Sequence, residues 1–239
     1  MKLLGLRTTF LLCLIVVRMT TSCAGQNHQQ SSELAEKVMA ENTIEKSLSA
    51  KVSLSGKARI ENDKLIIEYK VHNNLDRSIY VFDEMIAWQN YEQKIDHATA
   101  YCFWEEPKTL RLVRATLRIP QEKDVYALEI PYAREVKGRS EVTGRIELGS
   151  PVAEKSAFYA APDEKNSKTV RTEKIRLLIG WTQQREGMKI TEVEIGGEKV
   201  LRIRGSWSAP FHRLVEEQFN LPLELNVHTD VFDRQMPLN

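Results

Sequence analysis

The stretch Lys64–Asp83, KLIIEYKVHNNLDRSIYVFD, decides the fold class of this chain. In its first half, apolar side chains recur at every second position, the period of a half-buried β-strand; they are Leu65, Ile67, Tyr69 and Val71. Residues 72–78 supply turn formers whose short side chains bond to the local backbone. Residues 78–82, SIYVF, are β-branched and aromatic. The stretch therefore predicts two strands joined by a polar turn, at the centre of an all-β core.

The same pattern recurs along the rest of the chain. Apolar side chains alternate over 175–181 and 221–227, and Gly196-Gly197 marks the turn of a predicted hairpin over 193–203. Turn signals separate roughly nine to eleven such strands, and no helix is long enough to connect parallel strands. We therefore predict a mainly β fold, an antiparallel β-sandwich over residues 50–239. The pattern resembles an immunoglobulin-like or related sandwich. The resemblance does not go beyond architecture, because the Cys pair and central Trp of antibody domains are missing.

Three segments are less regular. Residues 83–107 are rich in aromatic side chains and are predicted to form a long connection over one end of the sandwich. Residues 109–119 fit either a helix or a strand with a bulge, and the β-rich surroundings favour a strand. The arginines in this segment, Arg111, Arg114 and Arg118, are predicted to form a solvated face, with contacts to acidic groups or phosphates as the alternative. Residues 211–220, between two prolines, have room for one helical turn.

Composition excludes several classes of protein. The chain has 239 residues, 42% of them hydrophobic and 28% charged, which is typical of a globular protein. Leaving out the three basic residues of the first 22, the 34 basic residues become 31, against 33 acidic ones. A near-neutral chain does not support nucleic-acid binding. Of the three cysteines, Cys102 is expected to be an inert, buried thiol, and the count excludes a disulfide-rich scaffold.

Residues 1–22 have the layout of a secretory signal. Basic residues come first, an apolar run from Phe10 to Val17 follows, and small residues lead to Cys23. The run is too short to span a bilayer, which takes about 20 residues. The segment resembles a bacterial lipoprotein signal, in which the cysteine is lipidated and becomes the first mature residue. Ser22 fits that pattern, whereas Thr20 departs from the usual aliphatic residue and Arg18 is an unusual charge there.

The resemblance implies an exported protein that is anchored to a membrane through Cys23. Ala24, rather than Asp, implies the outer membrane, facing the periplasm. The alternative is ordinary cleavage after Ala24, which would give a soluble periplasmic or secreted protein. Residues 23–49 are then expected to be a tether, in which 31–48 have the residues of a short, weakly amphipathic helix.

The sequence contains no phosphate-binding glycine loop, nucleophile elbow or zinc-protease helix, so we assign no catalytic residue, metal or cofactor. The histidines are scattered. A candidate binding surface is formed by three aromatic residues, Trp88, Tyr91 and Trp104, with Asp83 and Glu105. Such a set suits sugar stacking or a protein interface, and filling of the core is the competing interpretation. Two of the acids Asp83, Glu84, Glu105 and Glu106 could also build a paired-carboxylate glycosidase site, and the default interpretation is that they are solvated acids on a loop.

These observations favour an exported lipoprotein that acts as a non-enzymatic interaction or envelope-structural module. The expected partners are the membrane, through Cys23, and an envelope protein or glycan. The alternative is a carbohydrate-binding or carbohydrate-processing β-sandwich protein, suggested by the aromatic and acidic residues of 83–107.

Overall fold

The computed structural model describes residues 51–89, 92–120, 124, 130–205 and 212–229, in which every regular element is a β-strand. The predicted signal, tether and N-terminal helix lie outside these residues. The strands in chain order are β1 (Val52–Glu61), β2 (Lys64–Asn73), β3 (Ile79–Gln89), β4 (Glu92–Asp96), β5 (Tyr101–Glu105), β6 (Thr109–Arg114), β7 (Tyr132–Val136), β8 (Ser140–Gly149), β9 (Val152–Ala153), β10 (Ser167–Thr172), β11 (Lys174–Thr182), β12 (Lys189–Ile195), β13 (Glu198–Arg204), β14 (Arg213–Phe219) and β15 (Leu223–His228).

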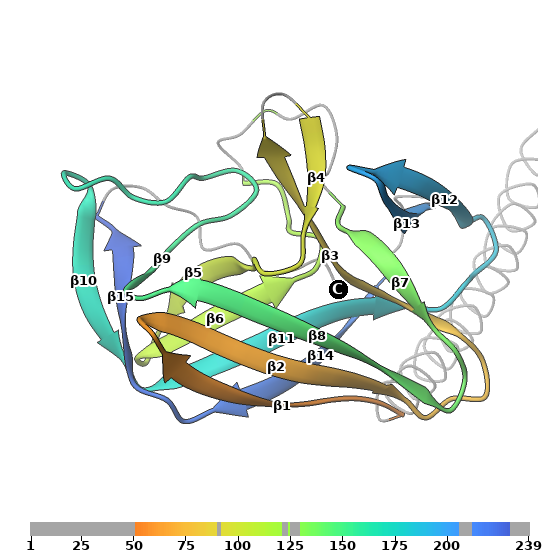
Figure 1. The fold of residues 1–239 in the computed structure, drawn as a ribbon, viewed down its shortest axis with the longest axis horizontal. Coiled ribbons are helices and arrows are strands. Elements are labelled where there is room, and N and C mark those ends of the chain that lie inside the picture. Colours follow the sequence, from red (N-terminus) through yellow and green to blue (C-terminus); the bar gives the residue numbers. More distant parts are fainter. Residues whose placement is uncertain (1–50, 90–91, 121–123, 125–129, 206–211, 230–239) are drawn as a thin grey trace, which may run out of the picture. The chain divides into compact units, whose positions relative to one another are not determined.

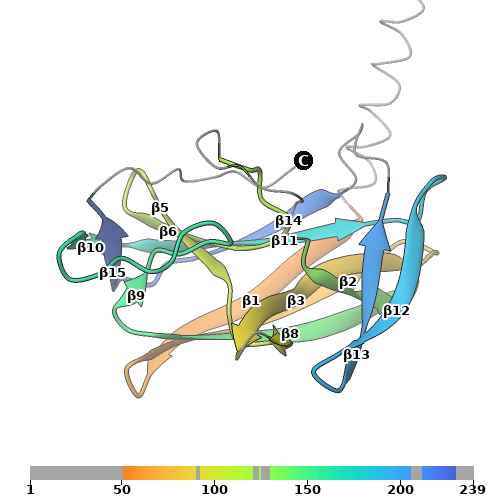
Figure 2. The ribbon, with the colours of Figure 1, turned by 90° about the horizontal axis from the view of Figure 1, so that it is seen from above.

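These strands confirm the predicted mainly β fold, and their antiparallel-rich sheets have the layout of a β-sandwich. One layer is the sheet β1-β2-β8, and the other is a larger sheet in the order β12-β13-β7-β3-β11-β6-β5, with β14 on β11 and β4 on β3 (Figures 1 and 2). A smaller sheet, β10-β15-β9, adjoins the larger one through a bridge between Cys102 and Lys155. Two strand pairs, β6 with β11 and β9 with β15, are parallel.

The stretch that decides the fold class forms β2 and the first part of β3, as predicted. Leu65, Ile67 and Val71 are completely buried, since β2 is the middle strand of its sheet and presents them to the opposite layer. Between β1 and β2, Asn62 and Asp63 both have positive φ angles, 50° and 57°, which a two-residue hairpin turn of type I′ requires. The predicted hairpin at Gly196-Gly197 uses the same conformation.

Two predictions about the irregular segments are wrong. Residues 83–107 are not one long connection, because β3 continues to Gln89 and β4 and β5 follow. Residues 213–219 form β14 instead of a helical turn, since they pair with β11 from Ile175 to Trp181. Tertiary pairing outweighs the weak local pattern in both cases.

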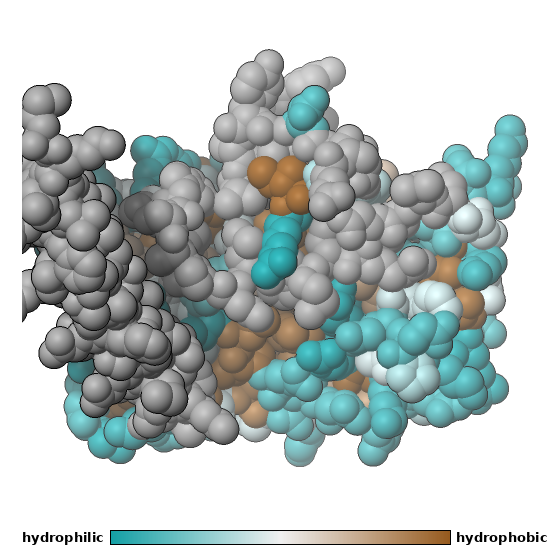
Figure 3. All heavy atoms as spheres, turned by 180° about the vertical axis from the view of Figure 1, so that it is seen from behind, coloured by the Kyte–Doolittle hydropathy of each residue, from teal (hydrophilic) through white to brown (hydrophobic). Residues whose placement is uncertain are grey.

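The core takes in most large apolar side chains of the described residues. Cys102 is completely buried, as predicted, and burial raises the pKa of its thiol to about 12. Exposed exceptions are Ile60, Trp88 and Ile119. In Figure 3, hydrophilic side chains line most of the lower and right-hand edges of the described residues, and hydrophobic side chains are seen further in. In the described part of the chain, no helix has the length and apolar character needed to cross a membrane.

Candidate functional site

A β-bulge on β3 brings two acidic side chains to the same side of the strand. The pairing of β3 with β7 shifts by one residue, from Val81 opposite Arg134 to Glu84 opposite Tyr132. Neighbouring residues of a regular strand point to opposite faces, and the extra residue of a bulge changes that direction. As a result, Asp83 and Glu84 are both buried and both reach Arg134.

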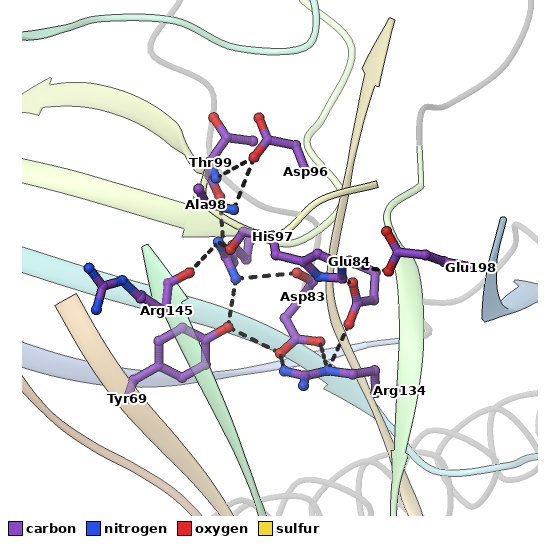
Figure 4. A network of polar contacts seen from close by, with 11 residues as sticks. Tyr69, Asp83, Glu84, Asp96, His97, Ala98, Thr99, Arg134, Arg145 and Glu198 are labelled. Carbon is purple, nitrogen blue, oxygen red and sulfur yellow. Dashed lines mark hydrogen bonds and ion pairs between the residues drawn. The ribbon is translucent and has the colours of Figure 1, made fainter. Parts of the chain in front are cut away.

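The guanidinium of Arg134, on β7, holds both carboxylates. Its Nε donates to Asp83 Oδ1 at 3.0 Å and lies 2.9 Å from Glu84 Oε1, and its Nη2 also donates to Asp83 (Figure 4). Burial alone would lower the pKa of Arg134, but the hydrogen bond to Asp83 and the two carboxylate charges together raise it. Arg134 therefore stays charged in the fold.

Tyr69 joins this cluster from the opposite layer. Its hydroxyl donates to Asp83 Oδ2 at 3.1 Å and accepts from Arg114 Nη1 at 2.8 Å. Burial, followed by the charge of Asp83, raises the pKa of Tyr69, so the hydroxyl keeps its proton. The ring has room because its partner on β8 is Gly144, where a Cβ atom would overlap the ring.

Arg114, on β6, is only 1% exposed, and this corrects the prediction of a solvated arginine face. Its remaining donors bind backbone carbonyls at 2.6–3.3 Å, those of Asp83, His97, Thr99 and Arg145. Arg111 is buried as well, 4.9 Å above the ring of Phe103. Of the predicted row, Arg118 alone is exposed. The buried guanidinium of Arg114 thus ties both layers to the segment after β4.

His97 lies at the open side of the network, between two carboxylates. Its Nδ1 is 2.8 Å from Glu84 Oε2, and its Nε2 is 2.6 Å from Glu198 Oε2. Its side chain is 57% exposed, whereas that of Glu84 is 4% exposed. Burial and the nearby charge of Asp83 raise the pKa of Glu84. The network therefore runs from the buried Tyr69 to a solvent-accessible imidazole.

These side chains form a wall of a pocket of about 880 Å³, and ligand sites of small molecules measure about 300–1,000 Å³. The glycines of β1 and β8, Gly56 and Gly144, belong to its lining. The pocket thus offers hydrogen-bond donors and acceptors on rigid strands. Among the described residues, no group of three or more His, Cys, Asp or Glu side chains is arranged to hold a metal ion.

No family model, curated protein or solved structure matches this chain.

The structure separates most residues of the predicted binding surface. Asp83 lines the pocket, but Trp88, Trp104 and Glu105 do not. Trp88 is 65% exposed near the end of β3. Trp104 is partly buried, with the Lys168 ammonium 5.7 Å from its ring, and Glu105 pairs with Arg176 at 3.0 Å. Tyr91 lies outside the described residues.

Sequence reasoning missed most of the network. It assigned Tyr69 to the core and named Glu84 only as one of several loop acids. Arg134 received no role, although it alternates with the apolar Tyr132 and Val136 in the period-two pattern of a strand. A charged residue at such a position is the signal that could have been used, because a buried charge needs a partner.

Proposed function

We propose that this chain is an exported, membrane-anchored binding module of the cell envelope. Its sandwich binds a small hydroxyl-bearing ligand, such as a saccharide unit, in the pocket beside Arg134. The observation that carries the proposal is the bulge that turns Asp83 and Glu84 onto one arginine in a pocket wall. Export and the anchor at Cys23 rest on the N-terminal sequence.

The energetic cost of the network supports a role in binding. Taking charges out of water costs several kcal/mol per ion, and a packed apolar core of equal volume is often as stable or more stable. Asp83 is 1% exposed and Glu84 is 3% exposed, so both carry this cost in full. Stability alone gives little reason to bury these groups. Preorganised polar groups in a pocket do provide ligand specificity.

The hydrogen bonding favours binding over acid–base catalysis by these carboxylates. Both oxygens of Asp83 are occupied, by Arg134 and by the hydroxyl of Tyr69. Asp83 and Glu84 also share the same Arg134 nitrogen, at 3.0 Å and 2.9 Å. An inverting glycosidase separates its acids by about 6.5–9.5 Å to admit a water molecule, which this arrangement does not provide.

The charge balance indicates the kind of ligand. In the buried part of the pocket, two carboxylates, Asp83 and Glu84, face two guanidinium groups, Arg114 and Arg134. The charged lining is completed by the exposed side chains of Lys57, Lys70, Arg145 and Glu68. A neutral ligand with several hydroxyl groups can both donate to and accept from such groups without adding an unpaired charge. No tryptophan lines the pocket among the described residues, so recognition would rest on hydrogen bonds.

Titration of the isotopically labelled protein with glucose, N-acetylglucosamine and glucuronate tests this proposal by NMR. We expect a neutral sugar to shift the amide signals of Gly56 and Gly144, which line the pocket, and to leave Gly196 and Gly197 unchanged. Glucuronate should bind more weakly. Arg134→Lys, which keeps the charge and loses the fork, should weaken binding at least about 10-fold, since bidentate geometry is lost. Arg139→Lys, on an exposed pair with Asp76, is the matched control.

The proposal is wrong if none of the three sugars shifts the pocket glycines. It is equally wrong if a sugar binds the Arg134→Lys variant as tightly as it binds the wild type.

A further inference from the structure

A second polar cluster lies on sheet β1-β2-β8, apart from the buried network. Ser55 Oγ is 2.9 Å from His72 Nε2, and His72 Nδ1 is 3.0 Å from Glu141 Oε2. We propose that Ser55, His72 and Glu141 form a serine-hydrolase triad that cleaves ester bonds. This inference does not require a ligand to bind beside Arg134, although Ser55 belongs to the lining of the same pocket.

The strand register places the three side chains close together on the outer face of the sheet. His72 on β2 has two direct partners in the sheet, which are Glu141 on β8 and Ser53 on β1. Ser55 is two residues beyond Ser53 and so shares the same face. The buried Val52 and Leu54 alternate with these serines, which confirms that the serines face outward.

Each group has the position that its role in acyl transfer requires. His72 Nε2 is within hydrogen-bond reach of the Ser55 hydroxyl and can take its proton as general base. Glu141 orients the imidazole through Nδ1. Lys70 Nζ, 2.6 Å from Glu141 Oε1, holds the second carboxylate oxygen. That hydrogen bond is the main reason why the pKa of Glu141 is lowered, so the positioning group stays ionised.

Backbone geometry supplies a donor for the oxyanion. The backbone carbonyl of Lys51, just before β1, accepts a hydrogen bond from the amide N–H of Asn74. In an antiparallel pair such hydrogen-bonded positions recur at every second residue, so Ser55 also forms a hydrogen-bonded pair with β2. The N–H of Gly56 then points away from β2, toward the edge of β1 on which no strand of the described residues pairs. The amide after the nucleophile serves as an oxyanion donor in many hydrolases. Both Ser55 and Gly56 belong to the lining of the pocket.

The reaction balances with water as the only co-substrate. Ser55 Oγ forms a bond to the ester carbonyl carbon while its proton passes to His72 Nε2. The carbon–oxygen bond to the alcohol breaks, and the alcohol leaves with that proton. Water then attacks the acyl-serine, His72 again takes and returns a proton, and the carboxylic acid is released.

Labelling of the purified full chain with a fluorophosphonate probe tests the triad, because serine attack forms an oxygen–phosphorus bond and expels fluoride. We expect mass spectrometry to find the probe on Ser55, and Ser55→Ala to abolish labelling. His72→Gln should slow labelling at least about 100-fold, which is the lower end of general-base contributions. Ser53→Ala, on the same face of the same strand, should label like the wild type.

Glu141 acts through His72, so its variant needs a separate readout. Glu141→Gln should slow labelling while the melting temperature and the labelled residue stay the same. Absence of label on Ser55, equal labelling of Ser53, or an unchanged rate in His72→Gln would each overturn the proposal. Circular dichroism of every variant ensures that a loss of labelling is not a loss of fold.

Discussion

The ring of Tyr69 on β2 lies across the backbone of its register partner Gly144 on β8. This contact lets the hydroxyl reach Asp83 and Arg114 in the opposite layer. An aromatic residue that covers a glycine on the neighbouring strand is a known device for fixing register in sheets. Here it also places the phenol at the centre of the polar network.

Gly144→Ala should destabilise the fold by about 1–3 kcal/mol, the usual cost of overpacking. The new methyl group would overlap a ring that cannot move without breaking its hydrogen bonds. Chemical denaturation gives the unfolding free energy. Gly149→Ala at the end of the same strand, where a Cβ meets nothing within 4 Å, is the control. Equal stability of the two variants would show that the Tyr69 ring is free to shift.

Arg114→Met should be more damaging, by about 3–5 kcal/mol, because it leaves the Tyr69 hydroxyl and four backbone carbonyl groups without their buried, charged donor. Arg118→Met removes an exposed arginine four residues later and should change stability by less than about 0.5 kcal/mol. Urea denaturation of both variants measures the difference. A loss below 1 kcal/mol for Arg114→Met would contradict the role given to this residue.

His212 gives the stability a specific pH dependence. It packs edge-on against Phe82, with ring centroids 5.5 Å apart, and burial lowers its pKa to about 4. The fold therefore favours the neutral imidazole. The stability from this preference is fully present above the ordinary histidine pKa of about 6.5 and is lost as the pH falls toward 4. Between pH 7 and pH 4 the wild type should lose roughly 2–3 kcal/mol relative to His212→Gln.

This comparison uses unfolding free energies of the two proteins at both pH values. Acidic residues titrate in both proteins, so their contribution cancels in the difference. A difference that does not change with pH would mean that His212 is protonated as easily in the fold as in the unfolded chain.

Cys23→Ser should release the protein from the membrane fraction of an expressing bacterium, because the predicted lipid attachment site is lost. Cys13→Ser, inside the apolar run of the signal, should leave the protein in that fraction. Incorporation of labelled palmitate into the wild type, and not into Cys23→Ser, is the direct measurement. Retention of Cys23→Ser in the membrane would disprove lipidation at this residue.

The strands with a clean alternating pattern could be predicted from the sequence, because side-chain direction in a strand depends only on the next few residues. The alternating pattern predicts the strands at Lys64–Asn73 and Lys174–Thr182 and the hairpin at Gly196-Gly197. The all-β sandwich follows from their number and from the turns between them. The burial of Cys102 follows instead from its residue type. Asp83 was also named, as part of an aromatic surface to which the structure does not assign it.

The candidate site was decided by tertiary structure alone. Whether Asp83 and Glu84 face the same side depends on a one-residue shift between β3 and β7, whose paired residues are about fifty positions apart. The burial of Arg114 likewise depends on carbonyl groups from the segment after β4 and from β8. The contacts from Ser55 through His72 to Glu141 also depend on the register of three strands. Local patterns determine which residues form strands, whereas packing between distant strands determines which polar groups meet.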